Sequence, residues 1–187
     1  TVLSRGLGDV YKRQNISSRL SSVKPSDVKE EFGSKIKYIL NGGKSKIGVE
    51  STILNLLEKP SLLRYGGLDT KKIENVLKKK LLINTNSKKK LSPGLFPLHY
   101  SPGIPLRVNV KKPKKDEAYL LIKKRKSKLK NYYYLSKMKN IDEAAKNLYS
   151  TLRKIKNDGF KKIAVEKIPN KGLGKTINDR LKRASKY

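Results

Sequence analysis

The sequence of 187 residues has no cysteine, no tryptophan and a single histidine, His99. Without cysteine, the chain forms no disulfide and performs no thiolate chemistry. One histidine excludes a multi-histidine metal site within one chain. No apolar run approaches the roughly 18 residues that a membrane-spanning helix needs, and the sequence shows no charged-then-apolar signal segment. These absences predict a soluble cytoplasmic protein with no membrane partner.

Negative charge is scarce, because 15 acidic residues stand against 46 lysines and arginines, a formal net charge of +31. Such an excess is typical of proteins that bind nucleic acid or phosphates. The basic residues are mostly lysines spread along the whole chain, however, as an AT-rich genome would produce, whereas a dedicated patch would be clustered and richer in arginine. Both explanations stay open. The alternative function is a non-catalytic basic module that binds RNA, including double-stranded RNA.

The chain divides into four segments by pattern. Residues 1–14 show no sustained period of 2 or 3.6, and we interpret them as a foreign or disordered leader. Residues 15–83 and 105–187 each hold a set of predicted helices and strands. Residues 84–104 between them are polar and then rich in proline and glycine, which predicts a stiff and extended linker.

Short apolar stretches alternate with turn-forming residues in the segment 15–83. Ser26 is expected to cap a short helix that stops at Gly33. Asp69 is expected to cap a second helix. The apolar stripe of that helix comprises Ile73, Val76, Leu77 and Leu81. The predicted strands are 37–40, 48–56 and 62–65.

Strand and helix patterns alternate in the segment 105–187, which indicates a parallel sheet with crossover helices. The predicted strands are 105–110, 118–122, 131–135 and 162–165, and the predicted helices are 141–157 and 173–185. Asn140 and Glu143 are expected to form a capping box. The tyrosines 132–134 could stack on bases, but alternation along a strand buries at least one ring, which favours core packing.

Four short motifs follow one another along the chain. Each motif alone is a weak to moderate signal, but the four in this order are a strong one. They are Gly48-Val49-Glu50-Ser51-Thr52-Ile53, Leu62-Leu63-Arg64-Tyr65-Gly66-Gly67, Ser92-Pro93-Gly94 and His99-Tyr100-Ser101-Pro102. The segments 15–21, 172–174 and 178–181 fit the same series. Together they resemble the threonylcarbamoyladenylate synthases. The resemblance implies an α/β fold with an incomplete YrdC-like α/β domain, a proline-rich linker and a small Rossmann-like parallel α/β domain.

The resemblance also implies a chemistry. Members of this family are nucleotidyltransferases that make L-threonylcarbamoyladenylate from L-threonine, bicarbonate and ATP, with release of pyrophosphate, for threonylcarbamoyladenosine modification of tRNA. ATP is then a substrate, Mg²⁺ accompanies it, and tRNA or downstream tRNA-modification enzymes are possible partners. Family members carry a long amino-terminal portion before the part that matches, so we expect this chain to be a truncated fragment that is inactive alone.

Seven residues of one site follow from the resemblance, with no catalytic and no metal-binding residue among them. ATP contacts are implied for Asn15, Ser21, Arg64 and Tyr100, threonine contacts for Ser51 and Thr52, and a linker contact for His99. Physical reasoning supports the arginine, because two glycines follow Arg64 and permit close approach of a polyphosphate to its guanidinium.

Other members of the set have two explanations each. A hydroxyl among apolar strand residues, such as that of Ser51 or Thr52, needs a partner, either a ligand or the neighbouring backbone. Tyr100 offers a nucleotide an aromatic face and a hydroxyl, or else the His99–Tyr100 pair only anchors the linker on the core. Ser18 stands where the family has glycine, so this turn is expected to be strained or altered.

Overall fold

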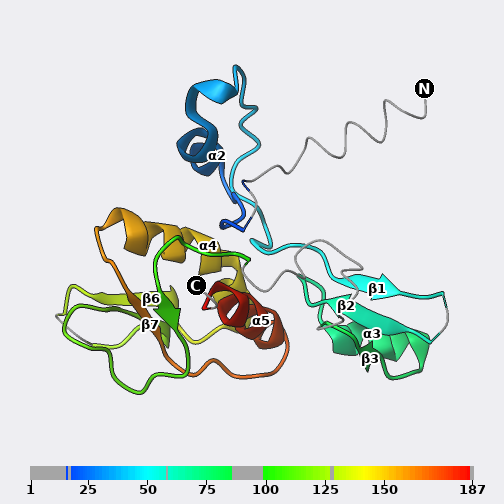
Figure 1. Cartoon of the computed structure of the whole chain (residues 1–187). Helices are drawn as coiled ribbons and strands as arrows, with labels where there is room; N and C mark the ends of the chain where they lie inside the picture. The colour runs from blue at the N-terminus through cyan, green and yellow to red at the C-terminus, as the bar shows by residue number, and fades with distance from the viewer. Residues whose placement is uncertain (1–15, 17, 58, 86–98, 127–128, 186–187) are drawn as a thin grey trace.

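The computed structural model describes residues 16, 18–57, 59–85, 99–126 and 129–185. Its elements form two α/β units, with α2 standing beside them (Figure 1). The first unit and its preceding helix comprise α2 (Pro25–Phe32), a 3₁₀ turn (Gly33–Lys35), β1 (Ile53–Asn55), β2 (Ser61–Arg64), α3 (Thr70–Leu77) and β3 (Leu82–Ile83). The second unit comprises β4 (Leu106–Arg107), β5 (Ala118–Lys123), β6 (Tyr132–Ser136), α4 (Ile141–Asn157), β7 (Ile163–Val165) and α5 (Gly174–Ala184). The predicted α/β class is confirmed.

The second unit is built on a four-stranded sheet in the order β4-β7-β5-β6, in which every neighbouring pair is parallel. This arrangement confirms the parallel sheet expected from strand–helix alternation. Helices α4 and α5 share one buried core with one face of the sheet. Members of that core include Leu120, Ile122, Leu148, Leu152, Ile177 and Leu181.

Helix α4 covers the predicted range, and its start is fixed by Asn140. The Asn140 side chain accepts hydrogen bonds from the backbone N–H groups of Asp142 and Glu143, both at 2.9 Å. The other predicted bond of the capping box, from the backbone N–H of Asn140 to the Glu143 carboxylate, is wrong. The Glu143 carboxylate accepts from the Ser136 hydroxyl at 2.6 Å, and that hydroxyl accepts from the backbone N–H of Asn140 at 2.8 Å.

The three tyrosines of β6 divide between the faces of the sheet. Tyr133 is 8% exposed, joins the core beneath the helices, and donates its hydroxyl to Asp158 at 2.6 Å. Tyr132 and Tyr134 lie half-buried on the opposite face, against the cluster that contains Tyr119. Alternation therefore buries one ring, as the sequence predicted.

The first unit buries less of its apolar surface. Strand β1 pairs antiparallel with β2, and β2 pairs parallel with β3. Leu57, Val76 and Leu82 are 93%, 82% and 56% exposed. The predicted stripe is wrong at Leu81, because α3 ends at Leu77, where Lys78 takes a left-handed conformation; Leu81 lies beyond the helix and is 6% exposed. The exposed apolar surface lies on strands and a helix that have few packing partners among the described residues.

The predicted strand at 37–40 is wrong. No strand is present there, and Tyr38 and Leu40 are 85% and 94% exposed. A strand is stable only when a neighbour completes its hydrogen-bond ladder. In the part of the chain that the structure describes, no strand lies beside this stretch.

The cap predicted for the first helix is also wrong. Helix α2 begins at Pro25, so Ser26 lies inside it. The Asp27 carboxylate caps the helix instead, because it accepts from the backbone N–H of Val23 at 2.9 Å and of Lys24 at 3.3 Å. Proline at the first helical position suits the start of a helix, since its missing N–H would have no partner there.

Most of the predicted linker, residues 86–98, lies outside the described residues. The chain is described again from His99, and the backbone N–H of Ser101 donates to the carbonyl of Ser18 at 2.8 Å. The division of the chain at 83 and 105 stays a prediction. None of the helices among the described residues has the length and apolar character needed to cross a membrane.

Candidate functional site

Glu50 lies at the centre of a buried polar cluster where the two units meet. It is 7% exposed and precedes β1. Its carboxylate accepts hydrogen bonds from the hydroxyl of Ser21, the hydroxyl of Tyr149 at 3.0 and 3.1 Å, and Nε of Arg180 at 3.0 Å. These donors come from the segment before α2, from α4 and from α5. One carboxylate therefore joins three distant parts of the chain.

Arg180 is only 1% exposed, so its charge must be satisfied inside the protein. Besides the ion pair with Glu50, Nη1 contacts Asp179 at 2.5 Å, and Nη2 donates to the carbonyl of Tyr65 at 2.7 Å. The guanidinium carbon lies 4.4 Å from the centre of the Tyr100 ring. This distance suits a cation–π contact.

The charges of the cluster hold Glu50 ionised. Burial alone would raise the pKa of Glu50, but the positive charge of Arg180 and the hydrogen bond from Ser21 hold that pKa below its ordinary value. Burial holds the pKa of His99 below its ordinary value as well, although the charge of Glu50 opposes this. An ionised carboxylate with three donors around it orients hydroxyl groups and does not suit proton transfer.

Tyr100 lies where the linker returns to the protein. It is 1% exposed, and its ring stacks on that of Tyr149 at 5.9 Å and lies 4.1 Å from the ring of His99. Its φ of +60° is uncommon for a residue other than glycine. The Tyr100 hydroxyl and His99 Nδ1 are buried and have no hydrogen-bond partner among the described residues. Such atoms mark a position where a ligand or water would be favourable.

Arg64 and Ser51, predicted for different substrates, are in direct contact. Arg64 donates from Nε and Nη2 to the carbonyl of Ser51 at 3.1 and 3.0 Å, and from Nη2 to its hydroxyl at 3.2 Å. The Thr52 hydroxyl donates to the carbonyl of Leu68 at 2.8 Å and accepts from the N–H of Leu68 at 3.2 Å. The backbone of Leu68 thus satisfies the Thr52 hydroxyl, whereas Ser51 is exposed.

The turn after Arg64 needs a glycine because it lies against the backbone of Ser51 and Thr52. A Cβ atom on Gly66 would be 2.1 Å from the carbonyl carbon of Ser51 and from the nitrogen of Thr52. The hydroxyl of Thr176, on α5, donates to the Gly66 carbonyl at 2.8 Å. The turn is therefore fixed from the first unit on one side and from the second on the other.

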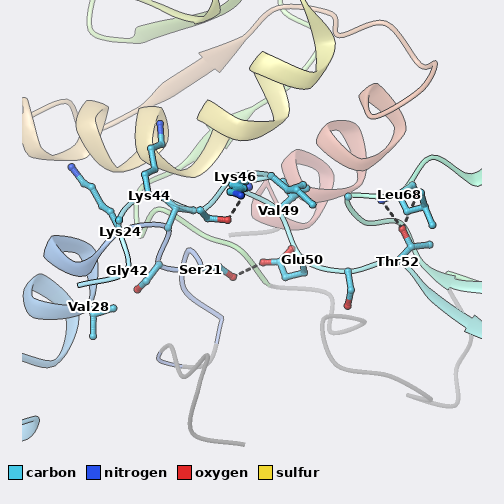
Figure 2. Close-up of a pocket in the computed structure, with 18 of the residues that line it drawn as sticks. Ser21, Lys24, Val28, Gly42, Lys44, Lys46, Val49, Glu50, Thr52 and Leu68 are labelled. Atoms are coloured by element: carbon cyan, nitrogen blue, oxygen red, sulfur yellow. Dashed lines mark hydrogen bonds between the residues drawn. The ribbon is translucent and has the colours of Figure 1, made fainter. Parts of the chain in front are cut away.

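A cleft of about 1280 Å³ opens beside the cluster. Figure 2 shows its wall, with Ser21 directed at Glu50 and Thr52 directed at Leu68. Cationic residues on the wall are Lys24, Lys44, Lys46 and Lys72. The volume exceeds the roughly 300–1,000 Å³ of common small-molecule sites. Apolar side chains, among them Val28, Ile47 and Ile73, line much of the rest of the cleft, so the lysines are the part of the wall that suits polyanionic ligands.

The structure brings most of the predicted site residues to this region. Ser21, Ser51 and Thr52 line the cleft, and Arg64 binds Ser51. The His99–Tyr100 pair packs beside Arg180. Asn15 lies outside the described residues. The assignment of these residues to ATP and threonine stays a prediction.

The turn at Ser18 was expected to be strained or altered. Ser18 has a φ of +69°, so the serine at the family's glycine position occupies a backbone region that favours glycine.

Reasoning from sequence missed Arg180 and Tyr149. A signal for Arg180 existed, because it lies on the apolar face of α5 between Ile177 and Leu181, where a charge needs a buried partner.

The family model described as the carboxyl-terminal domain of threonylcarbamoyl-AMP synthase matches residues 68–186, which is more than half of the chain. The chain belongs to the threonylcarbamoyl-AMP synthase family. A second family model, for Sua5, YciO and YrdC and described as telomere recombination, matches residues 13–66. The boundary between the two matched regions lies between β2 and α3.

Individual relatives agree with the family. The chain is 32% identical to a threonylcarbamoyl-AMP synthase of Pyrococcus abyssi over 92% of this chain and 56% of the relative. It is 27% identical to a threonylcarbamoyl-AMP synthase of Bacillus subtilis over 96% of this chain and 58% of the relative. The chain thus spans a little over half the length of these curated relatives.

Solved structures of this family have a similar fold. The crystal structure of P. abyssi Sua5 with L-threonine matches with a TM-score of 0.79 at 30% identity, over 92% of this chain and 56% of that one. A P. abyssi Sua5 variant, in which a neighbouring histidine and tyrosine are both replaced by alanine, matches with a TM-score of 0.74 at 30% identity, over 92% and 55%. The α/β fold is therefore shared with Sua5.

Proposed function

We propose that the cleft and the polar cluster belong to a site that makes L-threonylcarbamoyladenylate from L-threonine, bicarbonate and ATP, for threonylcarbamoyladenosine modification of tRNA in the cytoplasm. The observation that carries this proposal is the similarity to P. abyssi Sua5, whose structure holds L-threonine. Family membership supports the same reaction. The tRNA and downstream modification enzymes are proposed as partners on the same ground.

On the threonine side, we place Ser51, which Arg64 holds in position. The Ser51 hydroxyl is exposed to the cleft and bonded to the Arg64 guanidinium at 3.2 Å. A hydroxyl held in this way can bond the small polar groups of an amino acid. Thr52 stays a candidate, although its hydroxyl would have to exchange Leu68 for the ligand.

On the ATP side, we place Ser21, Arg64, Tyr100 and Asn15. The buried Tyr100 hydroxyl has no described partner, so a nucleotide would satisfy it. This chain's only histidine is followed by that tyrosine, and a histidine–tyrosine pair was the target of substitution in P. abyssi Sua5. The lysines of the cleft wall would attract the polyphosphate.

The reaction divides into two steps. The threonine amine attacks the carbon of bicarbonate, and loss of water leaves a carbamate. A carbamate oxygen then attacks the α-phosphorus of ATP, the bond to the α–β bridging oxygen breaks, and pyrophosphate leaves with the electron pair. Negative charge develops on the phosphates, where Arg64 would stabilise it. We do not place Glu50 as a base, because, despite its burial, the charge of Arg180 and the hydrogen bond from Ser21 hold its pKa below the ordinary value.

Magnesium would accompany ATP in this proposal. The described residues bring together no group of three or more histidine, cysteine, aspartate or glutamate side chains that could hold a metal. Mg²⁺ commonly binds through substrate phosphates and keeps several waters. We therefore place the ion with the phosphates and assign no residue to it.

Binding measurements on the purified chain test the proposal. We expect saturable binding of ATP and of L-threonine by calorimetry. We expect Arg64→Met to weaken both by about tenfold, since hydrogen bonds to a charged group contribute about 1.5–3 kcal/mol. Arg125→Met is the matched control, because Arg125 pairs with Glu166 on the surface of the second unit. No saturable binding of either ligand at about 10 mM would contradict the proposal.

A second measurement separates binding from turnover. With all substrates and Mg²⁺ present, we expect the chain by itself to release no pyrophosphate, because the relatives that carry the activity are almost twice as long. Threonine-dependent release of pyrophosphate from ATP would refute this inactivity.

A further inference from the structure

Several side chains of the second unit reach across to the first unit. Thr176 and Arg183 bond to the backbone carbonyls of Gly66 and Thr85 at 2.8 and 3.0 Å. Arg153 bonds to the carbonyl of Leu20 at 3.2 Å and lies 3.8 Å from the carboxylates of Asp27 and Glu31. Arg180 bonds to the carbonyl of Tyr65, and it also contacts two side chains of the candidate site, those of Glu50 and Tyr100.

We propose that Arg180 is a positioning residue of the synthase site, acting from α5 on the groups that face ATP. The inference rests on the proposed function. Through Glu50, Arg180 fixes the hydroxyl of Ser21, since the carboxylate binds both. Through the cation–π contact, the Arg180 guanidinium also fixes the ring of Tyr100. Arg180 itself touches no substrate in this proposal.

The geometry explains why arginine is needed for this role. Its Nε binds Glu50, its Nη2 binds the Tyr65 carbonyl and its guanidinium carbon lies over the Tyr100 ring. The guanidinium thus makes contacts in three directions at once. A lysine ammonium is a point charge and cannot bind in a fork while also stacking on a ring. Asp179 holds the remaining nitrogen, Nη1, which leaves the guanidinium one orientation.

The positioning role predicts an unequal effect on the two substrates. Ser21 and Tyr100, which Arg180 holds, are placed on the ATP side. Ser51, on the threonine side, is held by Arg64. Loss of the Arg180 guanidinium should therefore weaken ATP binding more than threonine binding, whereas general loosening of the fold would weaken both.

The experiment uses Arg180→Met in the whole chain, with Lys182→Met as the control, because it removes a positive charge from the same helix. Lys182 is exposed, whereas Arg180 is buried. Calorimetry gives the affinities for ATP and L-threonine, and NMR follows the ring protons of His99. Because His99 is the only histidine and lies 4.1 Å from the Tyr100 ring, its signals report the position of that ring without any ligand.

For Arg180→Met we expect ATP affinity to fall about tenfold, which is about 1.4 kcal/mol, and threonine affinity to change less than about twofold, which is under about 0.4 kcal/mol. The His99 signals should move, and Lys182→Met should leave both ATP affinity and His99 signals close to wild type. Unchanged ATP affinity in Arg180→Met, or an equal loss in both variants, would overturn the positioning role.

Two further outcomes remain informative. If the unmodified chain binds neither ligand, the proposed function fails, and the His99 signals alone then decide whether Arg180 holds the ring: movement supports this and no movement overturns it. If Arg180→Met does not fold by circular dichroism, Arg180→Lys replaces it. Lysine keeps the buried charge, so a folded lysine variant with wild-type ATP affinity would overturn the need for the guanidinium.

Discussion

The two units bury their side chains in different ways. In the second unit, α4 and α5 cover a parallel sheet, and Leu120 and Leu148 are fully buried. In the first unit, β1 and β3 are short, and Leu57 and Val76 are 93% and 82% exposed. The buried carboxylate of Glu50 is nevertheless held by donors from α4 and α5. The second unit thus supplies most of the main core, which Leu20, Val23 and Val49 of the first unit join, and the candidate site depends on helices of the second unit.

The largest expected effect tests the core of the second unit. Leu148→Ala removes a fully buried side chain from α4, so it should lower the free energy of unfolding by about 3 kcal/mol, within the range for buried leucines. Val76→Ala on α3 is the control and should change it by less than about 0.5 kcal/mol. Chemical denaturation measures both. Similar losses from the two variants would contradict the contrast between the units.

A smaller effect is expected at the junction. Gly66→Ala would place a methyl group 2.1 Å from the backbone of Ser51 and Thr52, so the turn must shift. Forced contacts of this kind cost about 1–3 kcal/mol, and we expect about 2 kcal/mol of unfolding free energy. Gly42→Ala is the control, because a Cβ atom there meets nothing within 4 Å. If Gly66→Ala is as stable as Gly42→Ala, the turn does not join the units as described.

The smallest effect concerns the charge of Glu50. Glu50→Gln keeps the shape but removes the charge facing Arg180, and should cost about 1.5 kcal/mol at neutral pH. The pKa of Glu50 is lowered on folding, so its stabilisation is present above the unfolded-state pKa of about 4.3 and is lost as the pH falls through the folded-state value.

Unfolding measured from neutral to acid pH tests this linkage. Below about pH 4.3, the wild type should lose stability more steeply than Glu50→Gln, because only the wild type has this carboxylate to protonate. Glu30→Gln, which changes an exposed glutamate of α2, is the control and is measured over the same pH range. Parallel pH profiles for wild type and Glu50→Gln would mean that Arg180 does not depend on the charge of Glu50.

Local patterns predicted the second unit well. The range of α4 was correct because its apolar period and the Asn140 cap are both local signals. The strand at 37–40 was wrong because a short apolar stretch carries no information about whether a neighbouring strand exists. The candidate site residues were predicted from the family resemblance that motif order supports, while Arg180 was missed because its partner is far away in sequence. Only the three-dimensional fold shows that Glu50 is that partner.

The distance along the chain between Glu50 and Arg180 has a consequence for biosynthesis. The two are 130 positions apart. At translation rates of about 5–20 residues per second, the carboxylate is made on the order of ten seconds before the arginine that pairs with it. During this interval the nascent first unit has no ion-pair partner from α5 for Glu50. Final assembly of the cluster is therefore a late event in synthesis, and the order of translation delays completion of the site until α5 has emerged.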